Sequence, residues 1–146
     1  MLRALKRILD TTQSDTPAHE RHHLQVAVAV LLHEARRSDY AEGDAEADLA
    51  VRALAGIFGV DPQESAALLE EGRAKAAQLS SFYAPLTVIK RDFSLEERIL
   101  LVEHLWRISF ADGQLNLYED HYVRKIAHLL HVPNTQSMLA RNRAKS

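Results

Sequence analysis

Two pairs of acidic residues have the types and spacing in this sequence that best suit a chemical role. Asp39 and Glu46 lie seven positions apart, and Asp112 and Glu119 repeat that spacing. Carboxylate oxygens are the ligands that hard divalent cations such as Mg²⁺, Ca²⁺ and Mn²⁺ prefer, and a cation relieves the repulsion between neighbouring carboxylates. The four residues therefore predict a metal site, provided that the fold brings both pairs into one cleft.

A structural role for the same residues remains open. An aspartate before a glycine at a helix end is ordinary loop chemistry, and a glutamate in a first helical turn interacts favourably with the helix dipole. Neither loop is an EF-hand, because the third and fifth positions counted from Asp39 are Ala41 and Gly43, and the twelfth from Asp112 is Val123. Any bound cation would need a different coordination from that motif.

Histidines supply a second set of candidate ligands. His19, Glu20 and His23 have the H-E-x-x-H spacing of zinc proteases. They fall in the first turns of a predicted helix and no third histidine follows at metalloprotease spacing, so we interpret them as a solvated polar turn. His33 and His104 lie on the central helices near the acidic loops and are additional candidate ligands, although packed histidines are more common.

The remaining composition excludes several classes of chemistry. The chain has no cysteine, so it has no disulfide, thiolate nucleophile or zinc–thiolate site. It contains no P-loop, no G-x-S-x-G motif and no dinucleotide-binding fingerprint. A formal net charge of -2 gives no general attraction for nucleic acid, and the basic end with Arg141, Arg143 and Lys145 is interpreted as a solvated tail.

The elements that position these residues are all predicted to be helices, because no segment shows sustained alternation of apolar and polar residues. N-cap and proline signals start helices at Pro17 and Pro62, and Ser94 with Glu97 forms a capping box. The predicted helices span 2–9, 17–37, 44–58, 62–78, a shorter one from Pro85, 95–110, 116–131 and 137–141. Gly59 is the predicted C-terminal stop of the third helix.

Two of these helices are almost wholly apolar and are predicted to form the centre of the fold. Residues 26–32 and 99–110 are apolar on nearly all sides, and Trp106 is assigned to the core. An offset of 73 residues superposes the two helices and takes Asp39 to Asp112 and Glu46 to Glu119. We interpret this as the duplication of a helix-loop-helix unit about a pseudo-twofold axis, which places the acidic loops in related positions.

The length of 146 residues predicts one domain. Its expected parts are an N-terminal helix and connector at 1–16, repeat one at 17–60, linking helices at 61–93, and repeat two with a C-terminal helix at 94–146. No stretch approaches the roughly 18 consecutive apolar residues of a membrane span. The basic, amphipathic residues 1–9 lack a secretion signal's apolar run, so we expect a cytoplasmic location, with peripheral membrane association left open.

The second half of the sequence resembles the TerB (tellurite-resistance) family. The run ISFADGQL at residues 108–115, followed by Glu119 and Asp120, is similar to the family pattern of an apolar helix leading into ADG, a leucine and a glutamate. Residues 96–106 and 123–130 also look like TerB-like proteins, and the resemblance covers roughly 24–140. The first copy departs from the pattern, with Ser38-Asp39-Tyr40 where the family usually has ADG.

The resemblance implies an all-α, TerB-like bundle of about seven to eight helices and a role connected with tellurite and general stress resistance. It implies no defined catalytic activity, and it suggests metal binding through acidic residues and action within complexes near the membrane. We therefore expect a non-enzymatic module that acts through protein contacts and holds a divalent cation at Asp39, Glu46, Asp112 and Glu119. The alternatives are a small metal-dependent hydrolase or phosphotransfer enzyme that uses the same carboxylates, and a scaffold that forms a homodimer.

Overall fold

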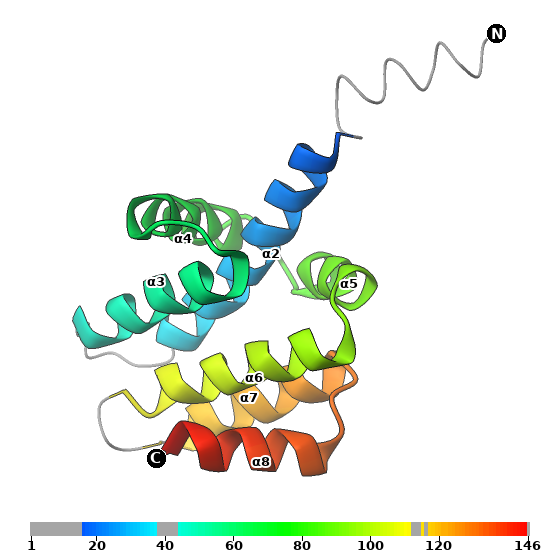
Figure 1. Cartoon of the computed structure of the whole chain (residues 1–146). Coiled ribbons are helices and arrows are strands. Elements are labelled where there is room, and N and C mark those ends of the chain that lie inside the picture. Colours follow the sequence, from blue (N-terminus) through cyan, green and yellow to red (C-terminus); the bar gives the residue numbers. More distant parts are fainter. Residues whose placement is uncertain (1–15, 38–43, 112–114, 116, 146) are drawn as a thin grey trace, which may run out of the picture.

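The computed structural model describes residues 16–37, 44–111, 115 and 117–145, and these form seven helices and no strand (Figure 1). This confirms the all-α prediction for the described part of the chain. The helix expected at residues 2–9 lies outside it. The helices are α2 (Pro17–Arg37), α3 (Asp44–Phe58), α4 (Pro62–Ala76), α5 (Tyr83–Asp92), α6 (Leu95–Ser109), α7 (Leu117–Leu129) and α8 (Asn134–Lys145).

The expected capping signals set several helix ends. The Thr16 hydroxyl accepts a hydrogen bond from the His19 amide at 3.0 Å, and an Asp61 carboxylate oxygen accepts one from the Glu64 amide at 2.8 Å. These bonds satisfy amides that have no partner within their own helix. After α3, Gly59 takes a φ of +68°, the left-handed conformation that ends many helices.

The start of α6 has the predicted capping box. The Ser94 hydroxyl accepts from the Glu97 amide at 3.2 Å, and the Glu97 carboxylate accepts from the Ser94 amide at 2.8 Å. We expect Ser94→Ala to lower the free energy of unfolding by about 0.5–2 kcal/mol, because one amide of the first turn loses its partner. Urea denaturation followed by circular dichroism measures this, with the exposed Ser80→Ala as the control. Equal stability of the two variants would contradict the prediction.

Two predicted helices differ from those observed. Helix α5 begins at Tyr83, before Pro85, since the missing amide of a proline in the first turn costs no intrahelical bond. Helix α8 was predicted only for residues 137–141, but it extends over Asn134–Lys145. Its apolar residues are few, and their packing against α6 and α7 supports a longer helix than the sequence pattern indicates.

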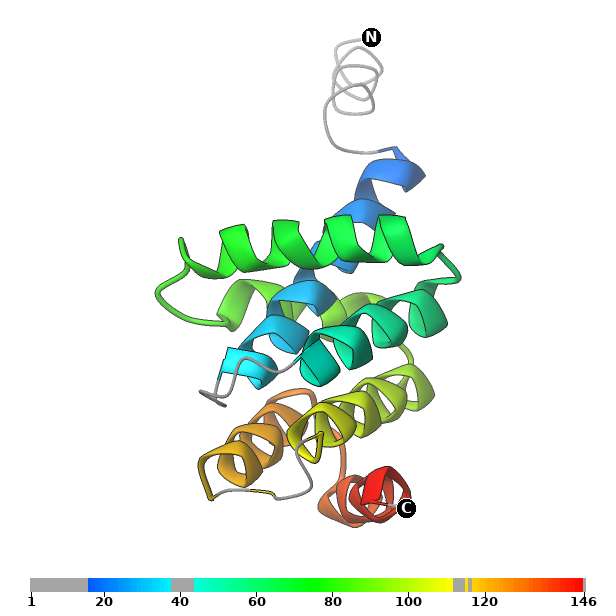
Figure 2. The ribbon, with the colours of Figure 1, turned by 90° about the vertical axis from the view of Figure 1, so that its left-hand side faces the viewer.

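Helix α2 is the centre of the N-terminal half. It contacts α3, α4, α5, α6 and α7, and α4 and α5 lie on its two sides (Figure 1). Its residues from Ala27 to Leu32 are at most 5% exposed, which confirms the prediction of a helix surrounded by others. Seen at right angles, α2 passes behind α4 and runs toward the layer formed by α6, α7 and α8 (Figure 2).

Helix α6 is the corresponding centre of the C-terminal half, but one side of it faces solvent. Leu101, Val102 and Leu105 are fully buried, whereas Leu95 and Leu100 are each 41% exposed. The nearly all-apolar helix predicted here is thus central in its packing, but some of its apolar side chains face solvent. Helices α7 and α8 cover only part of its circumference, and α2 and α3 contact another part.

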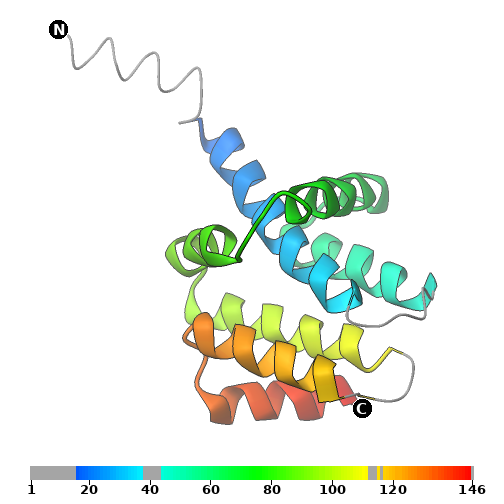
Figure 3. The same ribbon diagram turned by 180° about the vertical axis from the view of Figure 1, so that it is seen from behind.

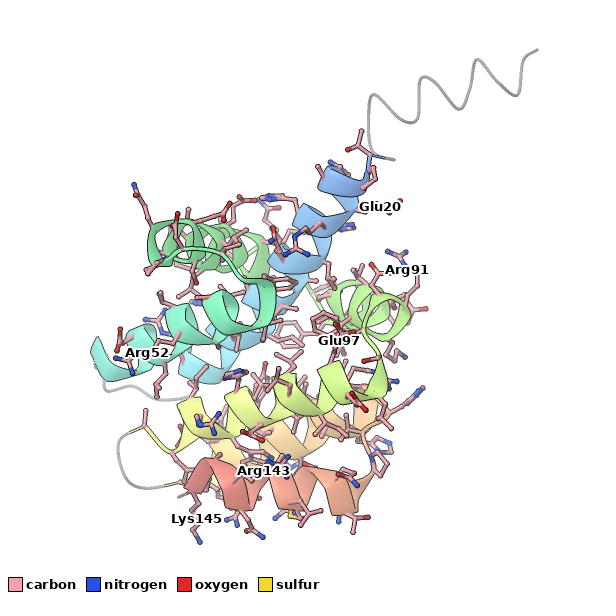
Figure 4. The ribbon with its side chains drawn as sticks, viewed as in Figure 1. Glu20, Arg52, Arg91, Glu97, Arg143 and Lys145 are labelled. Carbon is pink, nitrogen blue, oxygen red and sulfur yellow. The ribbon has the colours of Figure 1, made fainter. Side chains whose placement is uncertain are left out.

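Arg141 and Arg143 at the basic C-terminal end contact α6, which corrects the interpretation of a solvated tail for these two residues, whereas Lys145 is exposed as expected. The guanidinium of Arg141 lies 5.5 Å from the ring centres of both Trp106 and Phe110, and its side chain is 25% exposed. Arg143 donates to Glu103 of α6, so its charge is paired across two helices (Figure 4). These contacts hold α8 against α6 through cation–π and ionic interactions.

Candidate functional site

The structure describes only one complete side chain of the four predicted metal ligands. Asp39 and Asp112 lie outside the described residues, and so does the side chain of Glu46, whose backbone belongs to α3. Glu119 lies in the first turn of α7 and is 1% exposed. A carboxylate is strongly destabilised by burial unless it is paired or hydrogen-bonded, so this position is unusual for a glutamate.

The helix ends that flank the two acidic loops lie on the same side of the molecule. The end of α2 at Arg37 and the start of α3 at Asp44 flank the first loop, and the end of α6 at Ser109 and the start of α7 at Leu117 flank the second. All four ends point to one side in two opposite views (Figures 1 and 3). This arrangement is compatible with a shared acidic cleft.

A half-buried tyrosine of α7, three positions after Glu119, connects α7 to α2. The hydroxyl of Tyr122 donates a hydrogen bond to the backbone carbonyl of Leu31 at 2.8 Å. Burial, with smaller contributions from the negative charge of Glu34 and from Tyr118, raises the pKa of Tyr122 well above its usual range. Tyr122 therefore remains a neutral donor at physiological pH and fixes the start of α7 relative to α2.

Asp120, the neighbour of Glu119, already has cationic partners. Its carboxylate accepts a hydrogen bond from Arg124 at 2.7 Å, and Arg141 lies 3.8 Å away. The i, i+4 spacing of Asp120 and Arg124 could have been found from the sequence, whereas the approach of Arg141 from α8 could not. Asp120 is therefore an anion already paired with arginines from α7 and α8.

The carboxylate of Glu103 on α6 is also neutralised by arginines. Burial opposes the ionisation of Glu103, but hydrogen bonds from Arg143 and Arg107 outweigh burial and lower its pKa. Glu103 is thus an anion held between α6 and α8. It stabilises the packing of α8 and is not available as an open ligand.

The candidate histidines are not gathered into a ligand set within the described residues. His104 is half-buried on α6, where burial and the nearby charge of Arg107 lower its pKa. His33 is half-buried on α2. The part of the chain that the structure describes has no cluster of three or more histidine, aspartate or glutamate side chains able to hold a metal ion.

The H-E-x-x-H residues lie where the solvated interpretation predicted. His19, Glu20 and His23 are exposed on the first turns of α2, and the two histidine rings are 6.5 Å apart. His22 shares a hydrogen bond of 2.9 Å with Glu71 of α4. The motif spacing therefore belongs to an exposed helix start.

Among the described helices, none is long and apolar enough to cross a lipid bilayer. The part of the chain described thus agrees with the absence of a membrane span expected from the sequence.

Comparison with known proteins agrees with the all-helical fold. No curated protein matches the chain. The chain is similar in structure to a protein of unknown function from Porphyromonas gingivalis, with a TM-score of 0.59, 20% sequence identity, and coverage of 85% of this chain and 89% of that one. At this identity the likeness concerns the fold alone. The family model described as tellurite resistance protein TerB matches residues 25–142, and the chain therefore belongs to the TerB family.

Proposed function

We propose that this chain is a non-enzymatic helical module that holds one divalent cation between its two acidic loops and acts through protein contacts. The observation that carries the proposal is the burial of Glu119 at the start of α7. A carboxylate that is already desolvated and held by its helix loses little freedom on binding a cation, so it is a preorganised oxygen ligand. Asp112, Asp39 and Glu46 would complete the oxygen set, with Mg²⁺, Ca²⁺ or Mn²⁺ as the metal.

We propose that an internal duplication gives the two acidic loops equivalent positions, and paired features of the two halves support it. Helices α3 and α7 are each followed by a residue of positive φ, Gly59 at +68° and His131 at +58°, and these residues are 72 positions apart. In each half an arginine of the central helix donates to a carbonyl at the end of the next helix, and the two arginines are 77 positions apart, about one helical turn more than the 73-residue offset. Arg21 binds the Phe58 carbonyl at 2.6 Å, and Arg98 binds the Leu130 carbonyl at 2.6 Å.

The proposed repeat includes a third helix in each half. Ser65 of α4 and Ser137 of α8 are also 72 positions apart and are 0% and 2% exposed. Helix α4 packs on α2 and α3, and α8 packs on α6 and α7. The unit would then be α2–α3–α4, repeated as α6–α7–α8, with α5 as the connection. This extends the two-helix unit predicted from the sequence.

The start of α7 is a suitable surface for a protein partner. Leu117 is 85% exposed and Tyr118 is 70% exposed, and both precede the buried Glu119. Aromatic and large apolar side chains contribute strongly to protein interfaces. The affinity of a partner for this surface would depend on whether a cation is bound at the adjacent acidic loop. We propose a cytoplasmic role in the response to tellurite and general stress, with a homodimer as one form of the contact.

Calorimetric titration tests the cation site. We expect metal-stripped protein to bind Mg²⁺, Ca²⁺ or Mn²⁺ saturably, and Asp112→Asn and Glu119→Gln each to weaken binding by about tenfold or more, because the site loses charge or a buried ligand. The exposed Glu96→Gln on α6 is the matched control and should bind as the parent does. Zn²⁺ is included to detect adventitious binding by the histidines of α2.

Two outcomes would contradict the proposal. The absence of saturable heat with any cation, or unchanged binding by Asp112→Asn, would leave the acidic residues with a structural role only. Turnover of a phosphoester panel that depends on the cation would instead favour the metal-dependent hydrolase or phosphotransfer enzyme. Circular dichroism of Glu119→Gln separates loss of the site from loss of the fold.

A further inference from the structure

A small cavity lies between α2, α4 and α5, in the half of the fold that contains the exposed start of α2. Its volume is about 100 Å³. Helices α4 and α5 lie on either side of α2 (Figure 3), and residues from all three helices and from the segment after α4 line the cavity. Its apolar walls are Val26, Ala27 and Val30 from α2, Leu79 after α4, and Ala84 and Pro85 from the first turn of α5.

Two basic side chains complete the lining. Lys75 comes from the last turn of α4 and His23 from α2. Lys75 is exposed and makes no ion pair with any residue that the structure describes. Asp92, whose pKa is lowered chiefly by Arg91 and slightly by His23, is already paired with Arg91 at 2.8 Å. The lining therefore contains an ammonium group with no carboxylate partner.

The N-terminus of α5 adds to this positive character. Helix α5 has ten residues, and its N-cap, Phe82, makes no side-chain hydrogen bond to the first turn. Within that turn the Tyr83 amide donates to the Ser81 hydroxyl at 3.4 Å and Pro85 has no amide, which leaves the Ala84 amide, with its partial positive charge, to favour an anion. Ala84, in that turn, lines the cavity. The interior of the cavity is thus apolar, and an ammonium group, an imidazole and a helix N-terminus surround its opening.

We propose that this cavity binds a short-chain monocarboxylate, with the acyl chain against the apolar walls and the carboxylate near Lys75 and the first turn of α5. An apolar cavity of about 150 Å³ holds benzene, so 100 Å³ suits a chain of about four to five carbons. A neutral alcohol would leave the ammonium group without a partner, and an alkylamine would be repelled by it. The site is independent of the proposed cation site.

Titration of the full chain with pentanoate, followed by amide NMR shifts, tests the proposal. We expect saturable shifts confined to the lining residues, with a Kd of about 0.1–5 mM, a range typical of a ligand of this size. Pentanol should bind about three- to fivefold more weakly, as one surface ion pair contributes only modestly. Pentylamine should produce no saturable shift at the cavity. Equal binding of pentanol and pentanoate would overturn the assignment of a carboxylate ligand.

Two variants separate the apolar and ionic contributions. Ala84→Leu places a larger side chain at an exposed position of the mouth and should abolish pentanoate binding without unfolding the chain. Lys75→Met should weaken pentanoate about three- to fivefold and leave pentanol unchanged, and Lys90→Met on α5 is the matched control. No saturable shift at 20 mM pentanoate (about four times the weakest expected Kd), or shifts that survive Ala84→Leu in a folded protein, would overturn the proposal.

Discussion

Trp106→Ala is expected to lower the free energy of unfolding by about 3–5 kcal/mol. Trp106 is fully buried on α6, and its ring stacks with Phe110 at a centroid distance of 6.3 Å. Arg141 of α8 lies over the same ring, so the substitution removes a cation–π contact as well as apolar area. The variant leaves a cavity between α6 and α8 that the surrounding helices can fill only in part.

Urea denaturation followed by far-UV circular dichroism measures this loss, since the chain has a single tryptophan and loses its fluorescence probe with the substitution. Trp106→Phe should cost less, because it keeps one aromatic ring and leaves a smaller cavity, although it also loses a long hydrogen bond of 3.4 Å to Ser137. Leu117→Ala, at an 85% exposed position, is the control and should stay within about 0.5 kcal/mol of the parent. A loss below about 1 kcal/mol for Trp106→Ala would contradict the packing described for α8.

Gly72→Ala is expected to destabilise the protein by about 1–3 kcal/mol, although alanine is the better helix former by about 1 kcal/mol. A Cβ atom at Gly72 would lie 2.6 Å from the Ala29 Cβ and 2.9 Å from the Val30 backbone nitrogen. Helices α2 and α4 therefore approach so closely at this crossing that a methyl group forces them apart. Thermal denaturation of the variant provides the measurement.

The same substitution elsewhere in the chain is the control for helix propensity. Gly56 also lies in a helix, and a Cβ atom there would have no neighbour within 4 Å. Gly56→Ala should therefore stabilise the protein by about 0.5–1 kcal/mol. Ala29→Gly in the Gly72→Ala background should recover part of the loss, because it removes one of the clashing atoms. A stabilising Gly72→Ala would show that the crossing is looser than described.

Local signals in the sequence were sufficient to predict most helix boundaries. The ranges of α2 and α3 agree with prediction, and the caps at Thr16, Asp61 and Ser94 are formed as expected. A cap joins groups three residues apart, so the residues that determine it are adjacent in the chain. The predicted start of α5 was wrong because a proline is tolerated within the first turn and not only at its first position, and the predicted length of α8 was wrong because it depends on packing against other helices.

The candidate cation site was only partly predictable for the same reason. The spacing of Asp112 and Glu119 identified Glu119 as a candidate, but the spacing did not reveal that its side chain is 1% exposed. The burial of Glu119 accompanies the packing of α7 against α2. The hydrogen bond from Tyr122 to Leu31 in this contact joins residues that are 91 positions apart. No local pattern encodes such a pairing.

The sequence by itself determined the helical class, most of the helix ends, the TerB family and the four acidic residues to consider. Tertiary structure alone decided which apolar faces of α6 remain exposed, how Arg143 and Arg141 of α8 approach Glu103 and Asp120, and how closely α2 and α4 cross at Gly72. The physical reason is that capping and periodicity act over one or two turns of one helix, whereas burial and ion pairing depend on helices brought together from distant parts of the chain.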